Sequence, residues 1–135
     1  MATFTRFDDI DGSKKARELT REVYRFTGGG PIAKDFGLRD QIRRAAVSVM
    51  ANIAEGFGRG GNKEFISFLS MARGSCAEVR SHAYVALDAG LLADPEVTRI
   101  QALAGETEAL ISGLMKYLAA SDARGRKFAP SNREP

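Results

Sequence analysis

The sequence predicts an all-α fold, an antiparallel up-down-up-down four-helix bundle. Apolar residues recur every three or four positions in four segments, and no segment alternates convincingly between apolar and polar residues as a strand would. Glycine or proline separates the segments, and the short connections between them favour antiparallel neighbours. The bundle is expected to fill residues 1–121, with helices over about 13–27, 38–57, 62–90 and 95–121.

The first expected helix, about 13–27, has one apolar face. This face consists of Ala16, Leu19, Val23 and Phe26. The run Gly28-Gly29-Gly30-Pro31 ends the helix, because glycine and proline both interrupt helical backbone. We expect an irregular turn over residues 28–35 before the second helix begins.

The second expected helix is apolar nearly all round. Its inward stripe consists of Leu38, Ile42, Ala45, Ala46, Val49 and Ile53. A projection at about 100° per residue puts a second apolar set on the opposite side, namely Val47, Met50, Ala51 and Ala54. Either the rest of the bundle wraps this helix or another subunit covers it. Because no helix of a four-helix bundle is central, we favour a second subunit and predict the opposite set as an oligomer interface.

The third and fourth helices have recognisable boundary residues. Asn62 is a candidate N-cap and Gly90 a candidate C-cap of the third helix, whereas Asp94 and Pro95 suit the start of the fourth. The third helix carries Phe65, Phe68, Leu69, Ala72, Cys76, Val79, Ala83, Ala86 and Leu87 on its apolar side. The fourth carries Val97, Ile100, Leu103, Leu110, Ile111, Leu114 and Leu118. Residues 122–135 hold two prolines and few apolar residues, so we expect a flexible basic tail there.

Composition excludes several protein classes. A hydrophobic fraction of 44% with 27% charged residues is typical of a globular domain, and 135 residues suffice for one core. Cys76 and His82 are the single residues of their types, which excludes a disulfide within the chain and a Cys/His metal cluster, so we expect no metal and no cofactor. The amino terminus lacks the pattern of a secretory signal, and no apolar run reaches the roughly 20 residues of a membrane span. We expect a soluble cytoplasmic protein that has no membrane partner.

The central part of the chain resembles a known family. Residues 37–79, GLRDQIRRAAVSVMANIAEGFGRGGNKEFISFLSMARGSCAEV, closely resemble the signature of the 23S rRNA intervening-sequence protein family, also called the four-helix-bundle S23 family. Residues 15–27, KARELTREVYRFT, resemble its first helix, and residues 89–92 resemble the end of its third. Ser13 stands where the family usually has Trp, and Met50 where it often has Pro. These departures predict a weaker packing anchor and a straighter second helix.

The resemblance also implies an assembly and candidate partners. It implies a bundle that assembles as a ring, most often a homopentamer, with the second helix near the subunit contacts. The family resembles the accessory variability proteins of diversity-generating retroelements, which are basic pentamers that bind nucleic acid and a reverse transcriptase. Its members have no established enzymatic activity. The implied partners are therefore other copies of the chain, RNA or DNA, and a partner protein.

A glycine motif follows the second expected helix. Gly56, Gly58 and Gly61 match the spelling G-x-G-x-x-G of dinucleotide-binding loops. That fingerprint needs a preceding strand, whereas here a helix precedes it. We interpret the motif as a helix-to-helix turn, in which glycines supply positive φ and let the third helix start close by.

Other residues that could carry chemistry also have a structural interpretation. Asn52 and Glu55 lie among apolar neighbours, so each needs a hydrogen-bond partner if it is buried. One interpretation is that they belong to a functional site. We favour a structural role, in which Asn52 bonds to nearby backbone or to another subunit and Glu55 pairs with Arg59 one turn later. Cys76 lies on the apolar stripe and His82 is six positions away, so they are not expected to form a catalytic pair.

The basic residues give the strongest functional hypothesis, on a chain of net charge +3. Lys14, Arg17, Arg21 and Arg25 fall within about 80° on the first helix, opposite its apolar stripe, and form a row that could follow phosphates. Further predicted nucleic-acid-binding residues are Arg43, Arg44, Arg59 and Lys63. The alternative is a solvated helix face that Glu18 and Glu22 partly neutralise. No aromatic residues interleave with the row, so we expect binding to be sequence-tolerant and directed to the backbone.

Three classes of function compete on this sequence. We favour a non-enzymatic homo-oligomeric bundle that serves as a sequence-tolerant nucleic-acid-binding accessory protein. The alternative is an assembly or protein-docking module that binds no nucleic acid. An enzyme is the weakest candidate, because the motifs supply no convergent set of nucleophile, base and oxyanion donor.

Overall fold

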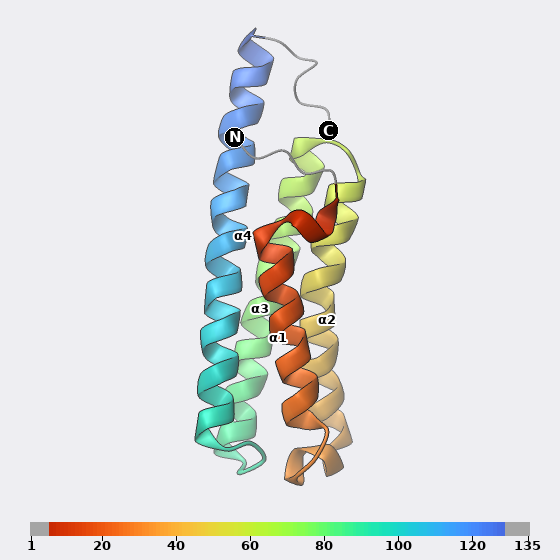
Figure 1. Ribbon diagram of the computed structural model, residues 1–135, viewed down its shortest axis with the longest axis vertical. Coiled ribbons are helices and arrows are strands. Elements are labelled where there is room, and N and C mark those ends of the chain that lie inside the picture. The colour runs from red at the N-terminus through yellow and green to blue at the C-terminus, as the bar shows by residue number, and fades with distance from the viewer. Residues whose placement is uncertain (1–5, 129–135) are drawn as a thin grey trace.

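Four long helices form the protein and confirm the all-α prediction. The computed structural model describes residues 6–128 and places the side chains of residues 6–121. The helices are α1 (Asp11–Thr27), α2 (Phe36–Gly58), α3 (Asn62–Asp88) and α4 (Asp94–Phe128), with 3-10 turns η1 (Phe7–Asp9) and η2 (Pro31–Lys34). Each of α1 and α3 packs against both α2 and α4, and neighbouring helices run in opposite directions (Figure 1). This arrangement is the predicted antiparallel four-helix bundle.

The helix boundaries follow local hydrogen bonding rather than the expected caps. Asp35 caps α2, because its side chain accepts a hydrogen bond from the backbone N–H of Leu38 at 3.1 Å. The caps expected at Asn62 and Asp94 were wrong: both residues lie inside their helices. At the start of α4, Glu96 reaches back to the backbone N–H of Ala93 at 2.9 Å, as the third residue of a capping box does.

The end of α3 agrees with the expected role of Gly90. This glycine has a φ of 74° and follows the last helical residues. Its backbone N–H donates to the Leu87 carbonyl, and the N–H of Leu91 donates to the Ala86 carbonyl at 2.8 Å. These two bonds form a Schellman motif, which needs a left-handed residue at the position of Gly90 and so favours glycine there.

The fourth helix extends beyond its predicted end. We expected it to end near residue 121, but α4 continues to Phe128 and projects past the rest of the bundle in Figure 1. Residues 122–128 include alanine, arginine and lysine, which favour helix, and the next proline is Pro130. The remainder of the expected flexible tail, residues 129–135, lies outside the described residues.

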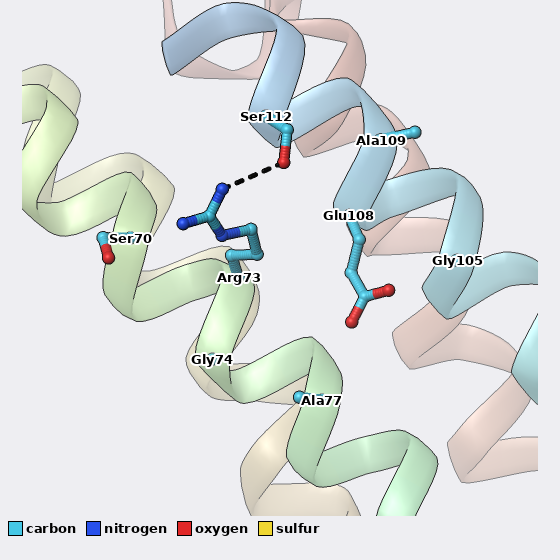
Figure 2. A pocket seen from close by; sticks show the side chains of 8 residues that line it. All are labelled: Ser70, Arg73, Gly74, Ala77, Gly105, Glu108, Ala109 and Ser112. Atoms are coloured by element: carbon cyan, nitrogen blue, oxygen red, sulfur yellow. Dashed lines mark hydrogen bonds between the residues drawn. The ribbon is translucent and has the colours of Figure 1, made fainter. Parts of the chain in front are cut away.

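Small side chains line the outer surface where α3 meets α4. The hollow there, shown in Figure 2, is lined by Ser70, Arg73, Gly74, Ala77, Gly105, Glu108, Ala109 and Ser112. Both charged groups already have protein partners. Arg73 donates to the hydroxyl of Ser112 at 3.1 Å, and Glu108 pairs with Arg80 at 2.8 Å. These contacts fix α4 against α3 and give each charged group of the hollow a polar partner.

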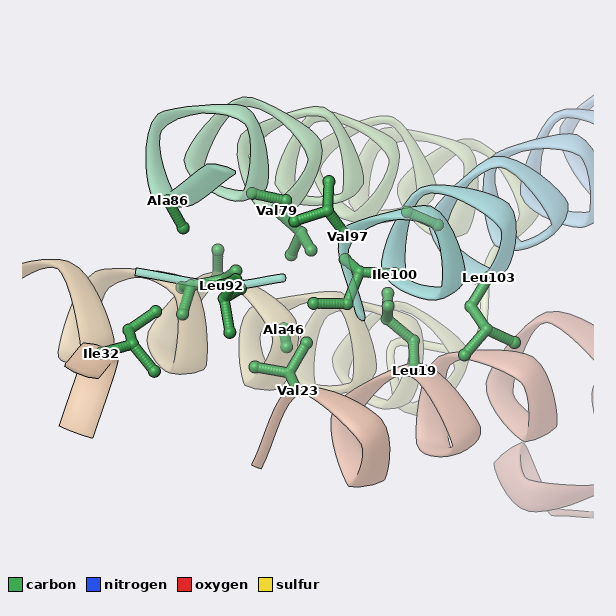
Figure 3. Packing of buried hydrophobic residues seen from close by; sticks show 14 residues of the cluster. Leu19, Val23, Ile32, Ala46, Val79, Ala86, Leu92, Val97, Ile100 and Leu103 are labelled. Carbon is green, nitrogen blue, oxygen red and sulfur yellow. The ribbon is translucent and has the colours of Figure 1, made fainter. Parts of the chain in front are cut away.

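The core lies between the four helices in two apolar clusters. Figure 3 shows the cluster at the η2 end, which includes Leu19, Val23, Ile32, Ala46, Val79, Ala86, Leu92, Val97, Ile100 and Leu103. The other cluster, near η1, includes Val49, Ile53, Phe65, Leu69, Cys76 and Ile111. One expected core residue, Leu110, is 37% exposed. Thr107 takes the inward position one turn before Ile111, and its hydroxyl is satisfied by the Leu103 carbonyl at 2.7 Å.

None of the helices, over the residues that the structure describes, combines the length and apolar character needed to cross a lipid bilayer.

Candidate nucleic-acid interface

Three cations of α1 form an exposed row without ion pairs. Lys14, Arg17 and Arg21 follow one another at three- and four-residue spacing and are all exposed. Within the described part of the chain, none of the three has a carboxylate within ion-pair distance. Their charges are therefore available to a ligand, and together these three residues make up the α1 row.

The alternative, in which Glu18 and Glu22 partly neutralise the predicted row, holds for Arg25 but not for the three cations of the α1 row. Glu18 pairs with Lys15 at 3.1 Å and with Arg99 of α4 at 2.9 Å. Glu22 pairs with Arg25 at 2.7 Å and approaches Arg99 at 3.5 Å. The hydrogen bonds from Arg25, with the charge of Arg99, lower the pKa of Glu22 to about 2 against the opposing effect of burial. Both carboxylates thus serve the contact between α1 and α4.

Three of the eight predicted nucleic-acid-binding cations are engaged within the chain. Arg25 is held by its ion pair with Glu22. Arg43 donates from Nε to the hydroxyl of buried Thr27 at 2.7 Å, and its guanidinium lies 4.4 Å from the centre of the Tyr24 ring. Arg59 pairs with Glu55 at 2.9 Å. Arg43 joins α2 to α1, whereas Arg25 and Arg59 each pair with a carboxylate about one turn away along the chain. These three side chains are therefore poorer candidates for phosphate binding than the α1 row.

Two further predicted cations are exposed but lie apart from the row. Arg44 is on the outward side of α2, and Lys63 is at the start of α3. Neither has an ion pair with any described residue. The structure therefore splits the predicted set of eight into a continuous row of three, two separate cations, and three engaged side chains.

The polar residues within α2 have the structural partners that we favoured. Asn52 donates to the backbone carbonyl of Ser48 at 2.9 Å and to its hydroxyl at 3.1 Å. The Ser48 hydroxyl in turn bonds to that of Ser75 in α3 at 2.9 Å. Glu55 pairs with Arg59, as expected. This network joins α2 to α3 and explains the polar residues without a catalytic role.

The apolar set on the outer side of α2 is unevenly exposed. Val47 is 44% exposed and Ala51 is also exposed, whereas Met50 and Ala54 are half-buried. Ala51 and Ala54 line a shallow hollow together with Gly58 and the Glu55–Arg59 pair. A patch that combines a large aliphatic side chain with small residues is suited to close helix contact.

The α1 row and the apolar set meet in one pocket. This pocket, of about 270 Å³, is lined by Phe7, Asp8, Ser13, Lys14, Arg17 and Met50. It lies where η1 folds back against α1 and α2. Ser13 and Met50, the two departures from the family pattern, thus lie side by side. One residue of the apolar set, Met50, therefore lies in the same pocket as two cations of the α1 row.

Two exposed aromatic side chains flank the α1 row, although none interleaves with it. Phe7 is 40% exposed in the pocket that Lys14 and Arg17 line. Tyr24 is 44% exposed and follows Arg21 by three residues on α1. The helix periodicity could have revealed Tyr24. It could not have revealed Phe7, because only the folding of η1 brings that ring beside the row.

The interpretation of the glycine motif as a turn was only partly right: Gly56 and Gly58 lie inside α2, and the positive φ of the turn belongs to Gly60, which is not one of the motif's glycines. A helix precedes it, and no strand occurs in residues 6–128. Gly56 is buried inside α2 against Phe65 and Phe68 of α3. Gly60 has a φ of 91° and makes the turn between the two helices. The motif lacks the strand-turn-helix geometry of a dinucleotide site.

The thiol and the imidazole do not form a catalytic pair. Cys76 is fully buried in the core, and burial raises the pKa of its thiol to about 12. His82 is half-buried and has no hydrogen bond to Cys76. Among the described residues, no group of three or more His, Cys, Asp or Glu side chains could hold a metal ion.

Comparison with known proteins gives a family match and one informative structural relative. The family described as 23S rRNA-intervening sequence protein matches residues 8–113. A crystal structure from Bacteroides thetaiotaomicron, of a protein with unknown function from the S23 ribosomal protein family, has a TM-score of 0.70 with 21% identity. The similarity covers 78% of this chain and 98% of that one. At 21% identity it shows a shared fold and nothing about function. No curated protein matches the chain.

Proposed function

The chain belongs to the 23S rRNA-intervening sequence protein family, and we propose that it is a non-enzymatic, homo-oligomeric protein that binds nucleic acid through the phosphate backbone. In this proposal the α1 row supplies the phosphate contacts, and the outer side of α2 supplies the contact between copies. Binding is sequence-tolerant, because lysine and arginine on phosphates carry no information about the bases.

One observation carries the nucleic-acid proposal: the carboxylates next to the row are turned to α4. Glu18 and Glu22 pair with Lys15, Arg25 and Arg99, so neither forms an ion pair with Lys14, Arg17 or Arg21. Asp8 lines the pocket beside Lys14 and Arg17, but its ion pair is with Arg6. A helix face on which every cation had a carboxylate partner would merely be solvated. The lack of such pairing along the row, over residues 6–121, favours an anionic ligand.

The assembly proposal is supported by the outer side of α2. Val47 and Ala51 are exposed, whereas half-buried Met50 packs against the core cluster near η1 and lines the pocket beside Lys14 and Arg17. The apolar surface that is open to a second copy is therefore centred on Val47 and Ala51. A second copy would remove this apolar surface from water at a gain of about 25 cal/mol per Å². The pentameric ring implied by the family resemblance would repeat the row around the assembly. Repeated rows give a multivalent surface even though each chain carries a net charge of only +3.

A protein-docking module that binds no nucleic acid is the second candidate. The same exposed side chains of α2, Val47 above all, favour it, since an apolar helix face can receive a helix of another protein. The two candidates differ in what the α1 row does, and a binding measurement separates them.

The test is a gel shift of purified protein on structured RNA and on duplex DNA near 50 mM salt, with light scattering on the same sample. We expect light scattering to give a mass above that of one chain. We also expect the gel shift to show retarded complexes whose affinity falls steeply as the salt concentration is raised. Retardation of neither nucleic acid would remove the nucleic-acid function and leave the docking module. A monomeric mass would refute the assembly.

A further inference from the structure

We infer that the α1 row binds single-stranded nucleic acid, with phosphates on Lys14, Arg17 and Arg21 and bases stacked on Phe7 and Tyr24. This inference rests on the proposed function and narrows its ligand from nucleic acid in general to an unpaired strand. It replaces the backbone-only binding expected from the sequence, because the fold places exposed rings at both ends of the row.

The first ring lies at the amino-terminal end of the row. Phe7 is 40% exposed and shares its pocket with Lys14 and Arg17. Asp8 lines the same pocket, but Arg6 holds its carboxylate through two hydrogen bonds of 2.9 Å. These bonds, with the charges of Arg6 and Arg17, keep the pKa of Asp8 below its usual range. The pocket therefore combines an apolar ring with two cations that have no ion pair to any described carboxylate.

The second ring lies at the other end of the row. Tyr24 is 44% exposed and follows Arg21 by three residues, which puts both on one side of α1. The guanidinium of Arg43 lies 4.4 Å from the centre of the Tyr24 ring and is held there by Thr27. This contact orients the ring and covers one of its faces, so a base would stack on the other face.

The spacing of these groups fits a short strand. From Lys14 to Tyr24 the helix rises about 15 Å, at about 1.5 Å per residue. That length corresponds to about four stacked nucleotides at about 3.4 Å each. Cations between two terminal rings are the combination that proteins use for unpaired strands, in which a groove follows the phosphates and rings accept the bases. In a duplex the bases are already stacked on one another, so the rings would gain nothing there.

An exposed tyrosine elsewhere in the fold offers a matched control. Tyr84 of α3 is 52% exposed, and α3 packs against α2 and α4 rather than beside the row. Both Tyr24 and Tyr84 lie in the interior of a helix, so replacement by alanine changes helix propensity equally. The two variants differ in whether the lost ring lies next to the α1 row and in the Arg43 contact of Tyr24, so a thermal melt of both variants accompanies the comparison.

The experiment measures fluorescence anisotropy of labelled 12-mers at 50 mM salt with the full-length protein. The probes are oligo-dT, oligo-U, a duplex of the same length, and a strand of the same charge that lacks bases. We expect both single strands to bind more tightly than the duplex or the baseless strand. Phe7→Ala and Tyr24→Ala should each weaken single-strand binding by about 5- to 150-fold and leave duplex binding unchanged. Phe7→Tyr should retain the affinity, and Tyr84→Ala should behave as the unmodified protein.

The outcomes separate this inference from the proposed function. If all four probes bound with equal affinity, and Phe7→Ala and Tyr24→Ala left that affinity unchanged, the stacking inference would be overturned. Binding through the phosphate backbone would remain. Binding of none of the probes would overturn both. If Phe7→Ala weakened binding to the single strand and to the duplex equally, Phe7 would serve the packing of η1, and the stacking inference would again be contradicted. A thermal melt of the variant would then show a loss of stability.

Discussion

Gly56 of α2 packs directly on Phe68 of α3: a Cβ on Gly56 would lie 2.6 Å from the Cβ of Phe68. It would also lie 3.0 Å from the Cδ1 atom of Phe65. Neither neighbour can give way easily, because the Cβ of Phe68 is fixed to its backbone and Phe65 is buried in the core. This contact sets how closely α2 and α3 approach at the end of the bundle that holds η1.

We predict that Gly56→Ala lowers the free energy of unfolding by about 1–3 kcal/mol, because the added methyl group overpacks the contact. Urea denaturation followed by circular dichroism measures the change. Gly74→Ala is the matched control, since Gly74 lies within α3 and a Cβ there meets nothing within 4 Å. The control should gain about 0.5–1 kcal/mol from the better helix propensity of alanine. Equal stabilisation of both variants would show that Gly56 is not a close-packing position.

The second prediction concerns the dependence of stability on pH. The pKa of Glu22 is lowered from 4.5 to about 2 by Arg25 and Arg99 in the folded protein. A carboxylate with a depressed pKa stabilises the fold above its unfolded pKa and loses that contribution as the pH falls through its folded value. The loss should therefore occur between about pH 4.5 and pH 2. Urea midpoints at pH 6 and pH 3 measure it.

The variant Glu22→Gln isolates this contribution. It should be less stable than the unmodified protein at pH 6 and should lose less stability on acidification to pH 3. Glu64→Gln is the control, since Glu64 is exposed and has no ion pair with any described residue. If Glu22→Gln and the unmodified protein lost stability in parallel, the ion pairs of Glu22 would not contribute to the fold.

The third prediction concerns the contact between copies. Ala51→Glu places a carboxylate on the exposed outer side of α2, where the proposed second copy packs. We expect the assembly to dissociate while helicity is retained, because Ala51 is not part of the core. Light scattering and circular dichroism measure the two properties. Ala102→Glu, at a position on α4 that is also exposed, should keep its assembled mass. An unchanged mass in Ala51→Glu would place the contact elsewhere.

Much of the fold could be predicted from the sequence because the helices carry strong local signals. Gly28 to Pro31 and Gly90 interrupt the helical periodicity, so the first and third helices have clear ends. The N-caps were not predictable in the same way. Asn62 and Asp94 are good capping residues by type, but each is the first residue of its helix, so the N-cap position falls one residue earlier, on Gly61 and Ala93.

The errors in the core and in α4 have physical causes. Thr107, and not Leu110, is buried on the inward side of α4. Its hydroxyl can be buried there because it donates to the Leu103 carbonyl within the helix. Few apolar residues and two prolines suggested a tail after residue 121, but both prolines, Pro130 and Pro135, come after the end of α4 at Phe128.

The candidate site was only partly predictable. Helical spacing correctly placed Lys14, Arg17 and Arg21 on one exposed face. It could not show that Glu18 and Glu22 turn to α4, because their partner Arg99 lies about 80 residues away in the sequence. The position of Phe7 likewise depends on tertiary packing of η1. Charge pairing and ring placement across helices are the properties that periodicity does not contain.

Phosphate binding by the α1 row is tested most directly by the salt dependence of affinity for a DNA duplex. The two proteins to compare are the unmodified protein and the double variant Arg17→Gln with Arg21→Gln. The slope of log K against log[salt] should become shallower by about one unit for each arginine that contacts a phosphate. Circular dichroism should show an intact bundle, since both side chains are exposed. An identical slope in the two proteins would contradict the proposal that the α1 row binds nucleic acid.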